Sequence, residues 1–198
     1  MRMKMLMATL AMAGMMGAQT QVQAQMGDAK MPAMAAGSMG DPGKELDGML
    51  TQFEKEIMGA AKAMPADKYD FSPASLKTAG AKFDGVRTFA DQVKHVAQAN
   101  YYFANGFSGL KLEVDLRGIM ALKTRDEIVA ALAGSFAFEH KAMATLNAKN
   151  AWESIKPIDG IQTRATLAAF SVAHGFDHYG QMVEYLRMNG IVPPASAK

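Results

Sequence analysis

The chain of 198 residues contains no cysteine, and this absence removes several classes of site. Without a thiol there is no disulfide, no thiolate nucleophile, and no zinc or iron–sulfur centre of the kind that cysteine ligands build. Any metal must therefore be held by histidine, aspartate, glutamate or main-chain groups. The stability of the fold must come from the packing of the core.

Runs of basic residues are also missing. The sequence has 21 Lys and Arg against 19 Asp and Glu, and removal of residues 1–24 would remove Arg2 and Lys4, so that the 21 basic residues become 19. A balanced charge without a Lys/Arg run gives no electrostatic footprint for nucleic acid, and we expect no nucleic-acid partner. Phosphate-binding loops, dinucleotide fingerprints and nucleophile–base pairs are likewise not found.

The N-terminus predicts export. Met1-Arg2-Met3-Lys4 is a short cationic start, the next 14 residues (5–18) carry no charge, and Val22-Gln23-Ala24 offers the small residues that a signal peptidase requires. This layout is typical of a secretory signal peptide, which we predict for residues 1–24. The apolar run is shorter than the ~20 residues that span a bilayer as a helix, and no later segment reaches that length without charges. The mature protein is therefore expected to be secreted or periplasmic, with an uncleaved N-terminal anchor as the alternative.

Residues 25–43 consist mainly of Gly, Ala, Met, Pro, Asp and Ser without periodicity, and we predict a flexible linker there. Residues 44–194 are predicted to form one domain, because four stretches in it repeat apolar residues at three- and four-residue steps. These stretches run from Leu46 to Met64, from Phe89 to just before Gly106, from Arg125 to Leu146, and from about Arg164 to Met188. No alternating stretch predicts a sheet. The expected fold is all-α, a four-helix bundle.

The chain has four histidines, and two of them, His174 and His178, lie one helical turn apart in the last stretch. Residues four apart on a helix share a face, so these imidazoles could hold one transition-metal ion. A catalytic site of this kind normally needs a third protein ligand, and His95 or His140 on a facing helix could supply it. Spacing alone does not decide between them. The alternative is a pair of ordinary packed, hydrogen-bonded histidines.

Three polar residues near these histidines suggest supporting roles. Asp91, four residues before His95, is either an acceptor for that imidazole or a solvated helix charge. Asp177 is a fourth ligand, a general base, or a carboxylate outside the ligand set, and Gln181 is expected to line the pocket. A zinc peptidase of the H-E-x-x-H type is not expected, because Gly175 stands where the glutamate would be.

Several segments resemble the DinB-like superfamily, which includes damage-inducible DinB proteins and related metal-dependent enzymes. They are Val93-Lys94-His95-Val96-Ala97, the segment 174–181 with its two histidines, the tail 185–194, and Met64-Pro65-Ala66-Asp67-Lys68-Tyr69-Asp70-Phe71. The resemblance covers roughly residues 44–194. It implies a four-helix bundle with one histidine ligand from the second helix and two from the fourth. By this resemblance the metal ligands are His95, His174 and His178, and His140 is structural.

The expected cofactor is one divalent metal ion, with zinc, nickel and iron all compatible with imidazole ligands. Binding should weaken as the pH falls through about 6.5, the ordinary histidine pKa. Some DinB-like proteins transfer low-molecular-weight thiols, but such cofactors are chiefly cytosolic, which fits poorly with an exported chain. We expect a metal-dependent hydrolase or transferase acting on a small molecule that the sequence does not identify. The alternative is a metal-binding or partner-binding bundle without turnover, and a monomer and a homodimer both remain open.

Overall fold

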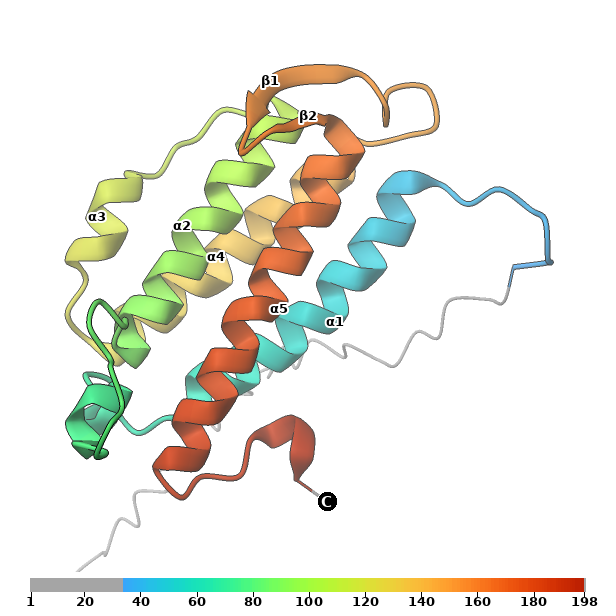
Figure 1. Ribbon diagram of the computed structural model, residues 1–198. Helices are drawn as coiled ribbons and strands as arrows, with labels where there is room; N and C mark the ends of the chain where they lie inside the picture. Colours follow the sequence, from blue (N-terminus) through green and yellow to red (C-terminus); the bar gives the residue numbers. More distant parts are fainter. Residues whose placement is uncertain (1–33, 198) are drawn as a thin grey trace, which may run out of the picture. The chain divides into compact units, whose positions relative to one another are not determined.

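The computed structural model describes residues 34–197, which are mainly helical (Figure 1). The predicted all-α four-helix bundle is confirmed, with a short fifth helix and a small hairpin added to it. The elements are α1 (Pro42–Ala63), α2 (Phe89–Ser108), α3 (Leu116–Ala121), α4 (Arg125–Met143), β1 (Ser154–Ile158), β2 (Ile161–Thr163) and α5 (Arg164–Met188). Short 3-10 turns occupy Ala66–Lys68, Pro73–Leu76 and Pro194–Ser196.

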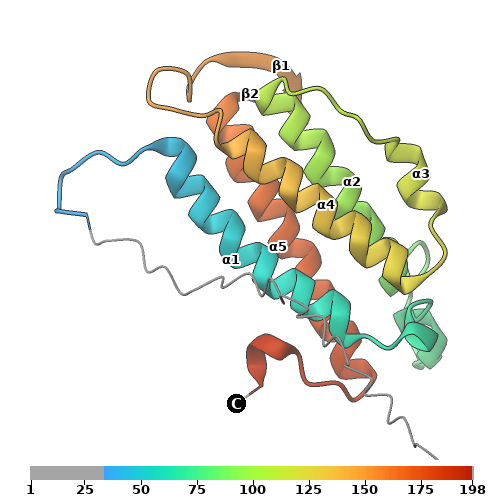
Figure 2. The ribbon, with the colours of Figure 1, turned by 180° about the vertical axis from the view of Figure 1, so that it is seen from behind.

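The four long helices close into a ring. α2 packs against α4 and α5, and α1 packs against the same two helices from the other side, as the opposite views of Figures 1 and 2 show. The apolar faces of all four meet in one core, because each helix repeats apolar residues with the period of a helix. The largest fully buried side chains include Phe53 and Ile57 of α1, Phe89 and Phe107 of α2, Leu132 and Phe136 of α4, and Leu167 and Met182 of α5.

Side-chain caps fix where the helices begin. The hydroxyl oxygen of Thr88 accepts a hydrogen bond from the amide of Asp91, and Thr124 and Glu127 form the capping box expected for α4. α1 begins at Pro42, two residues before the predicted domain boundary. Asp41 explains the earlier start, since its carboxylate caps the helix and proline is well suited to the first helical position.

The predicted end of α2 before Gly106 is wrong, because the helix continues to Ser108 and ends at Gly109, which has φ +73°. Gly106 serves close packing instead. A Cβ atom at this position would overlap the side chain of Ile158 from the hairpin and touch Leu167 of α5. Glycine is therefore needed here for the approach of the hairpin, whereas the left-handed conformation that ends a helix occurs three residues later.

The β1–β2 hairpin and α3 were not predicted from the sequence. The strands pair antiparallel, with Ile158 opposite Ile161, and the turn between them consists of Asp159 (φ +50°) and Gly160 (φ +80°). Two positive φ values are those of a type I′ turn, for which Asp-Gly is a favoured pair. The hairpin contacts α2 and α5 at the end of the bundle where α5 begins (Figure 1).

Among the described residues, no helix combines the length and the apolar character that crossing a bilayer requires. The predicted signal peptide, residues 1–24, lies outside the described part of the chain, as do residues 25–33 of the predicted linker.

Candidate metal centre

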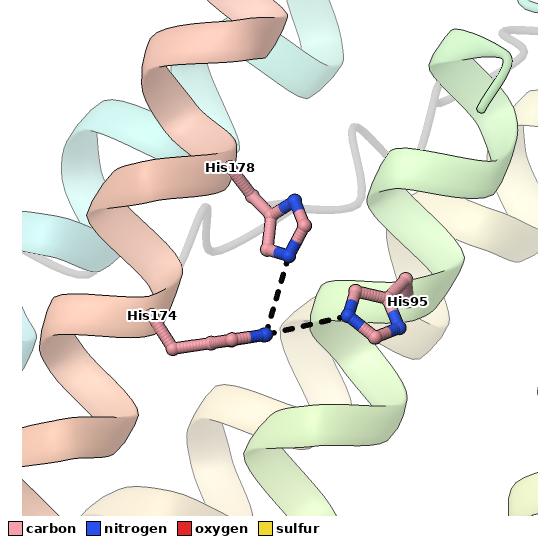
Figure 3. A group of neighbouring side chains, drawn as sticks. All are labelled: His95, His174 and His178. Atoms are coloured by element: carbon pink, nitrogen blue, oxygen red, sulfur yellow. Dashed lines mark hydrogen bonds between the residues drawn. The ribbon is translucent and has the colours of Figure 1, made fainter. Parts of the chain in front are cut away.

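Two helices bring three histidines together in the bundle. His95 comes from α2, and His174 and His178 come from successive turns of α5; all three rings point to one common centre (Figure 3). The Nε2 atom of His174 lies 3.3 Å from Nε2 of His95 and 3.2 Å from Nε2 of His178. One ligand nitrogen from each ring lies within 4.8 Å of the other two. In residues 34–197, these three histidines are the group of side chains spaced closely enough to hold one metal ion.

These spacings fit a single metal ion. Two nitrogen ligands bound at about 2.0–2.1 Å to a tetrahedral ion are about 3.3–3.4 Å apart. Both measured Nε2–Nε2 distances agree with that value, so the three histidines could hold a metal ion with little movement of their side chains.

A chain of hydrogen bonds sets the orientation of His178, which is buried. Its Nδ1 atom donates to the amide oxygen of Gln92, 2.7 Å away on α2. The Gln92 amide nitrogen donates to Gln181, and the amide nitrogen of Gln181 donates to the carboxylate of Asp177. Because an amide oxygen can only accept, the proton of neutral His178 is on Nδ1 and the lone pair of Nε2 faces the centre. Metal-binding histidines usually have such an acceptor on their second nitrogen.

His174 is held by packing rather than by a hydrogen bond. Its ring lies edge-on to Phe103, with centroids 5.4 Å apart, and beside Phe170. Its Nδ1 atom is buried and has no hydrogen-bond partner among the described residues. The only nitrogen of this ring that meets another polar atom is therefore Nε2, at the common centre.

Burial keeps the three imidazoles neutral. Desolvation lowers the pKa of His95 to about 4, and the charge of Arg87 adds to this effect. Desolvation, together with the neighbouring His174 and His95, lowers the pKa of His178 to about 4 as well, and burial also lowers the pKa of His174. Neutral imidazole is the form that binds metal, so competition by protons should begin well below the pH of 6.5 expected from the unperturbed residue.

His140 is not part of this group. It lies on α4, where its Nδ1 faces the carboxylate of Asp47 at 2.5 Å and its Nε2 faces that of Glu54 at 3.1 Å. An imidazole can donate from both nitrogens only when it is protonated. The hydrogen bond that His140 donates to Glu54 and its contact with Asp47 raise the pKa of His140 to about 9, against the opposing effect of burial. His140 thus connects α4 to α1 as a cation.

The polar neighbours differ in part from expectation. Asp91 does not accept a hydrogen bond from His95. Its carboxylate forms an ion pair with Lys94 at 2.9 Å instead. Asp177 is exposed and reaches the centre only through Gln181 and Gln92, so it is not a fourth ligand in this arrangement. Gln181 belongs to the same hydrogen-bond chain rather than to the wall of the pocket.

A pocket of about 350 Å³ adjoins two of the three histidines. Apolar and aromatic side chains form much of its wall, and the half-exposed Tyr102 and the exposed Asp159 lie at its rim. The lining residues are His95, Gln98, Ala99, Tyr102, Phe103, Leu116, Asp159 and His174. A small molecule in this pocket would therefore lie directly beside the candidate ligands.

Comparison with known families agrees with the geometry. The family model described as the DinB superfamily matches residues 49–182, which include all three clustered histidines, the whole of α2 and most of α5. The chain belongs to the DinB superfamily. No curated protein matches it.

The sequence did not reveal the structural roles of two residues near the candidate ligands of this DinB-superfamily chain. Gln92 lies three residues before His95 on the buried face of α2. A polar residue on this apolar face was the one sign in the sequence of a role in holding a ligand in place. Gly175 is required because a Cβ atom there would overlap the ring of Phe53, which packs against α5 between its two histidines. The glycine that excluded a zinc peptidase motif is therefore explained by packing.

Proposed function

We propose that the protein binds one divalent metal ion through His95, His174 and His178 and acts as a metal-dependent hydrolase or transferase on a small molecule. The observation that carries the proposal is the pocket of about 350 Å³ beside His95 and His174. A structural metal site is usually closed by its protein ligands, whereas a catalytic site keeps a position open to the substrate. Two of the three clustered histidines line a pocket, which matches the second arrangement.

The side chains around the candidate ligands have different roles. His178 is fixed by Gln92 with its Nε2 lone pair toward the centre, and the aromatic rings around His174 exclude water from one side of it. When bound, a divalent ion would supply Lewis acidity toward an oxygen atom of the substrate. Zinc, nickel and iron all suit three imidazoles, and small-molecule substrates suit the size of the pocket.

Titration of a cobalt-loaded protein with azide tests the open position. Visible absorption of Co²⁺ reports its coordination, so azide should change the spectrum of the wild-type protein. Tyr102→Trp places a larger side chain in the wall of the pocket at a residue that is not a proposed ligand, and it should weaken the response to azide. A cobalt spectrum that azide leaves unchanged would contradict catalysis at this site and favour a metal-binding or partner-binding bundle without turnover.

We also propose that the protein is exported after cleavage near Ala24. The support is the cationic start and the uncharged run of residues 5–18. Mass spectrometry of the exported form should give an N-terminus near Gln25. An intact chain confined to the cytoplasm would contradict export.

A further inference from the structure

We propose that the pocket beside the three histidines selects small molecules that carry a cationic nitrogen, and that the carboxylate of Asp159 is the selecting group. The inference rests on the proposed function in one respect, since it takes this pocket to be the substrate site. It adds the charge of the substrate, which the three histidines do not determine.

The hairpin holds Asp159 at the rim of the pocket. Asp159 is the first residue of the type I′ turn, and Ile158 before it packs against α2 at Gly106 and lies near Leu167 of α5. The turn is thus anchored to both helices that carry the histidines. Asp159 and His174 line the same pocket, so the carboxylate shares this space with the candidate ligands.

The remaining wall of the pocket is suited to a cation with an apolar body. Ala99, Tyr102, Phe103 and Leu116 supply apolar and aromatic surface, and Gln98 donates its amide hydrogen to the backbone oxygen of Leu116. Apart from the two histidines, Asp159 is the one acidic or basic side chain that lines this pocket. A carboxylate combined with aromatic faces is an environment that favours ammonium groups.

The other charged residues near the histidines lie outside the pocket, so Asp159 decides how a bound molecule is oriented. Arg87 lowers the pKa of all three histidines, and Asp177 raises that of His174 and His178, but neither residue lines the pocket. A bound molecule therefore meets Asp159 at the rim and, at the other end, His95 and His174 with the metal ion that they would hold. Its cationic nitrogen would lie toward the hairpin, and its uncharged polar atoms toward the histidines.

The turn itself offers a different reason for an aspartate at this position, because Asp tolerates positive φ better than most residues. Asp159→Asn separates the two explanations. Asn-Gly is favoured in type I′ turns at least as well as Asp-Gly, so the variant should keep the hairpin while losing the charge. Glu113→Gln is the matched control, since it removes one exposed negative charge from the loop before α3.

The test is an NMR titration of the purified protein with benzyltrimethylammonium, benzyl alcohol and benzoate. The quaternary ammonium cannot ligate a metal, and each titration is run with chelator and again with added Zn²⁺. With chelator present, we expect wild type to bind the ammonium about fivefold or more tightly than the alcohol and to bind benzoate most weakly, with shifts at amides around Tyr102 and Gly160. With Zn²⁺ present, benzoate should gain affinity because its carboxylate can ligate the ion. Asp159→Asn should reduce this preference about three- to fivefold, and Glu113→Gln should leave it unchanged.

An equal preference for the ammonium in Asp159→Asn and in wild type would overturn the inference, as would tighter binding of benzoate with chelator present. Metal uptake, measured on the same samples, keeps the proposed function separate. Uptake of Zn²⁺ without an ammonium preference refutes only the inference. An ammonium preference that depends on Asp159 in a chain that takes up no metal supports the cation site and refutes the metal-dependent function.

Discussion

The buried residue Glu139 should make the stability of the bundle depend on pH. This residue of α4 is fully buried; its Oε1 atom accepts a hydrogen bond from Ser171 of α5, and its Oε2 atom has no partner among the described residues. Burial raises the pKa of Glu139 to about 8, although the hydrogen bond from Ser171 acts in the opposite direction. The carboxyl group should therefore be protonated in the folded protein at neutral pH.

The sign and size of the effect follow from proton linkage. The unfolded chain releases the proton above pH 4.5, the ordinary value, whereas the folded chain retains it until about pH 8. Stability is therefore lost as the pH rises between these values, by about 1.4 kcal/mol per pH unit at most. Glutamine does not titrate, so the free energy of unfolding of Glu139→Gln relative to wild type should rise by about 2–3 kcal/mol between pH 5 and pH 7.

Urea unfolding of both proteins at pH 5, 6 and 7 measures this difference. The constant cost of placing an amide in the core cancels, because only the change with pH is compared. Glu113→Gln, an exposed control, should show a nearly constant difference from wild type. A constant difference for Glu139→Gln as well would mean that Glu139 is ionised in the folded protein, and the reasoning from burial would be refuted.

Two further substitutions test the surroundings of the candidate ligands. Gln92→Leu removes the acceptor of His178 and should weaken metal binding about 10- to 100-fold in a competition titration, whereas unchanged affinity would contradict the role given to this amide. Gly175→Ala places a Cβ atom in the ring of Phe53 and should lower the free energy of unfolding by about 1–3 kcal/mol, as measured with urea. Gly180→Ala on the same helix meets no atom within 4 Å and should be neutral or stabilising; equal effects of the two would contradict the packing.

The bundle was predictable because its signals are local. The capping box at Thr124, the apolar period of each helix and the Asn189-Gly190 stop all act within a few residues, and the predicted bounds of α5 agree with Arg164–Met188. Gly106 was misread because its reason is distant: the hairpin that needs the space is some fifty residues later in the chain. The strands of five and three residues, the first with a proline, and the six-residue α3 are too short for a periodic signal.

The candidate site was predictable only in part. The spacing of His174 and His178 indicates a shared helix face, but it leaves His95 and His140 as equal candidates for the third ligand. The resemblance to DinB-like proteins favoured His95, and the packing of α2 against α5 places that ring beside the pair. Gln92 and Asp159 escaped the sequence analysis because their roles depend on contacts between elements that no local pattern encodes.

Elemental analysis of the purified protein tests the central claim most directly. Wild type should contain about one divalent first-row metal ion per chain, and His95→Ala, His174→Ala and His178→Ala should each lose most of it, since three ligands are the number such a site requires. His140→Ala, with circular dichroism to confirm that the helices persist, should retain the metal. The account is contradicted if wild-type protein takes up no metal at neutral pH, or if His140→Ala loses the ion while His95→Ala keeps it.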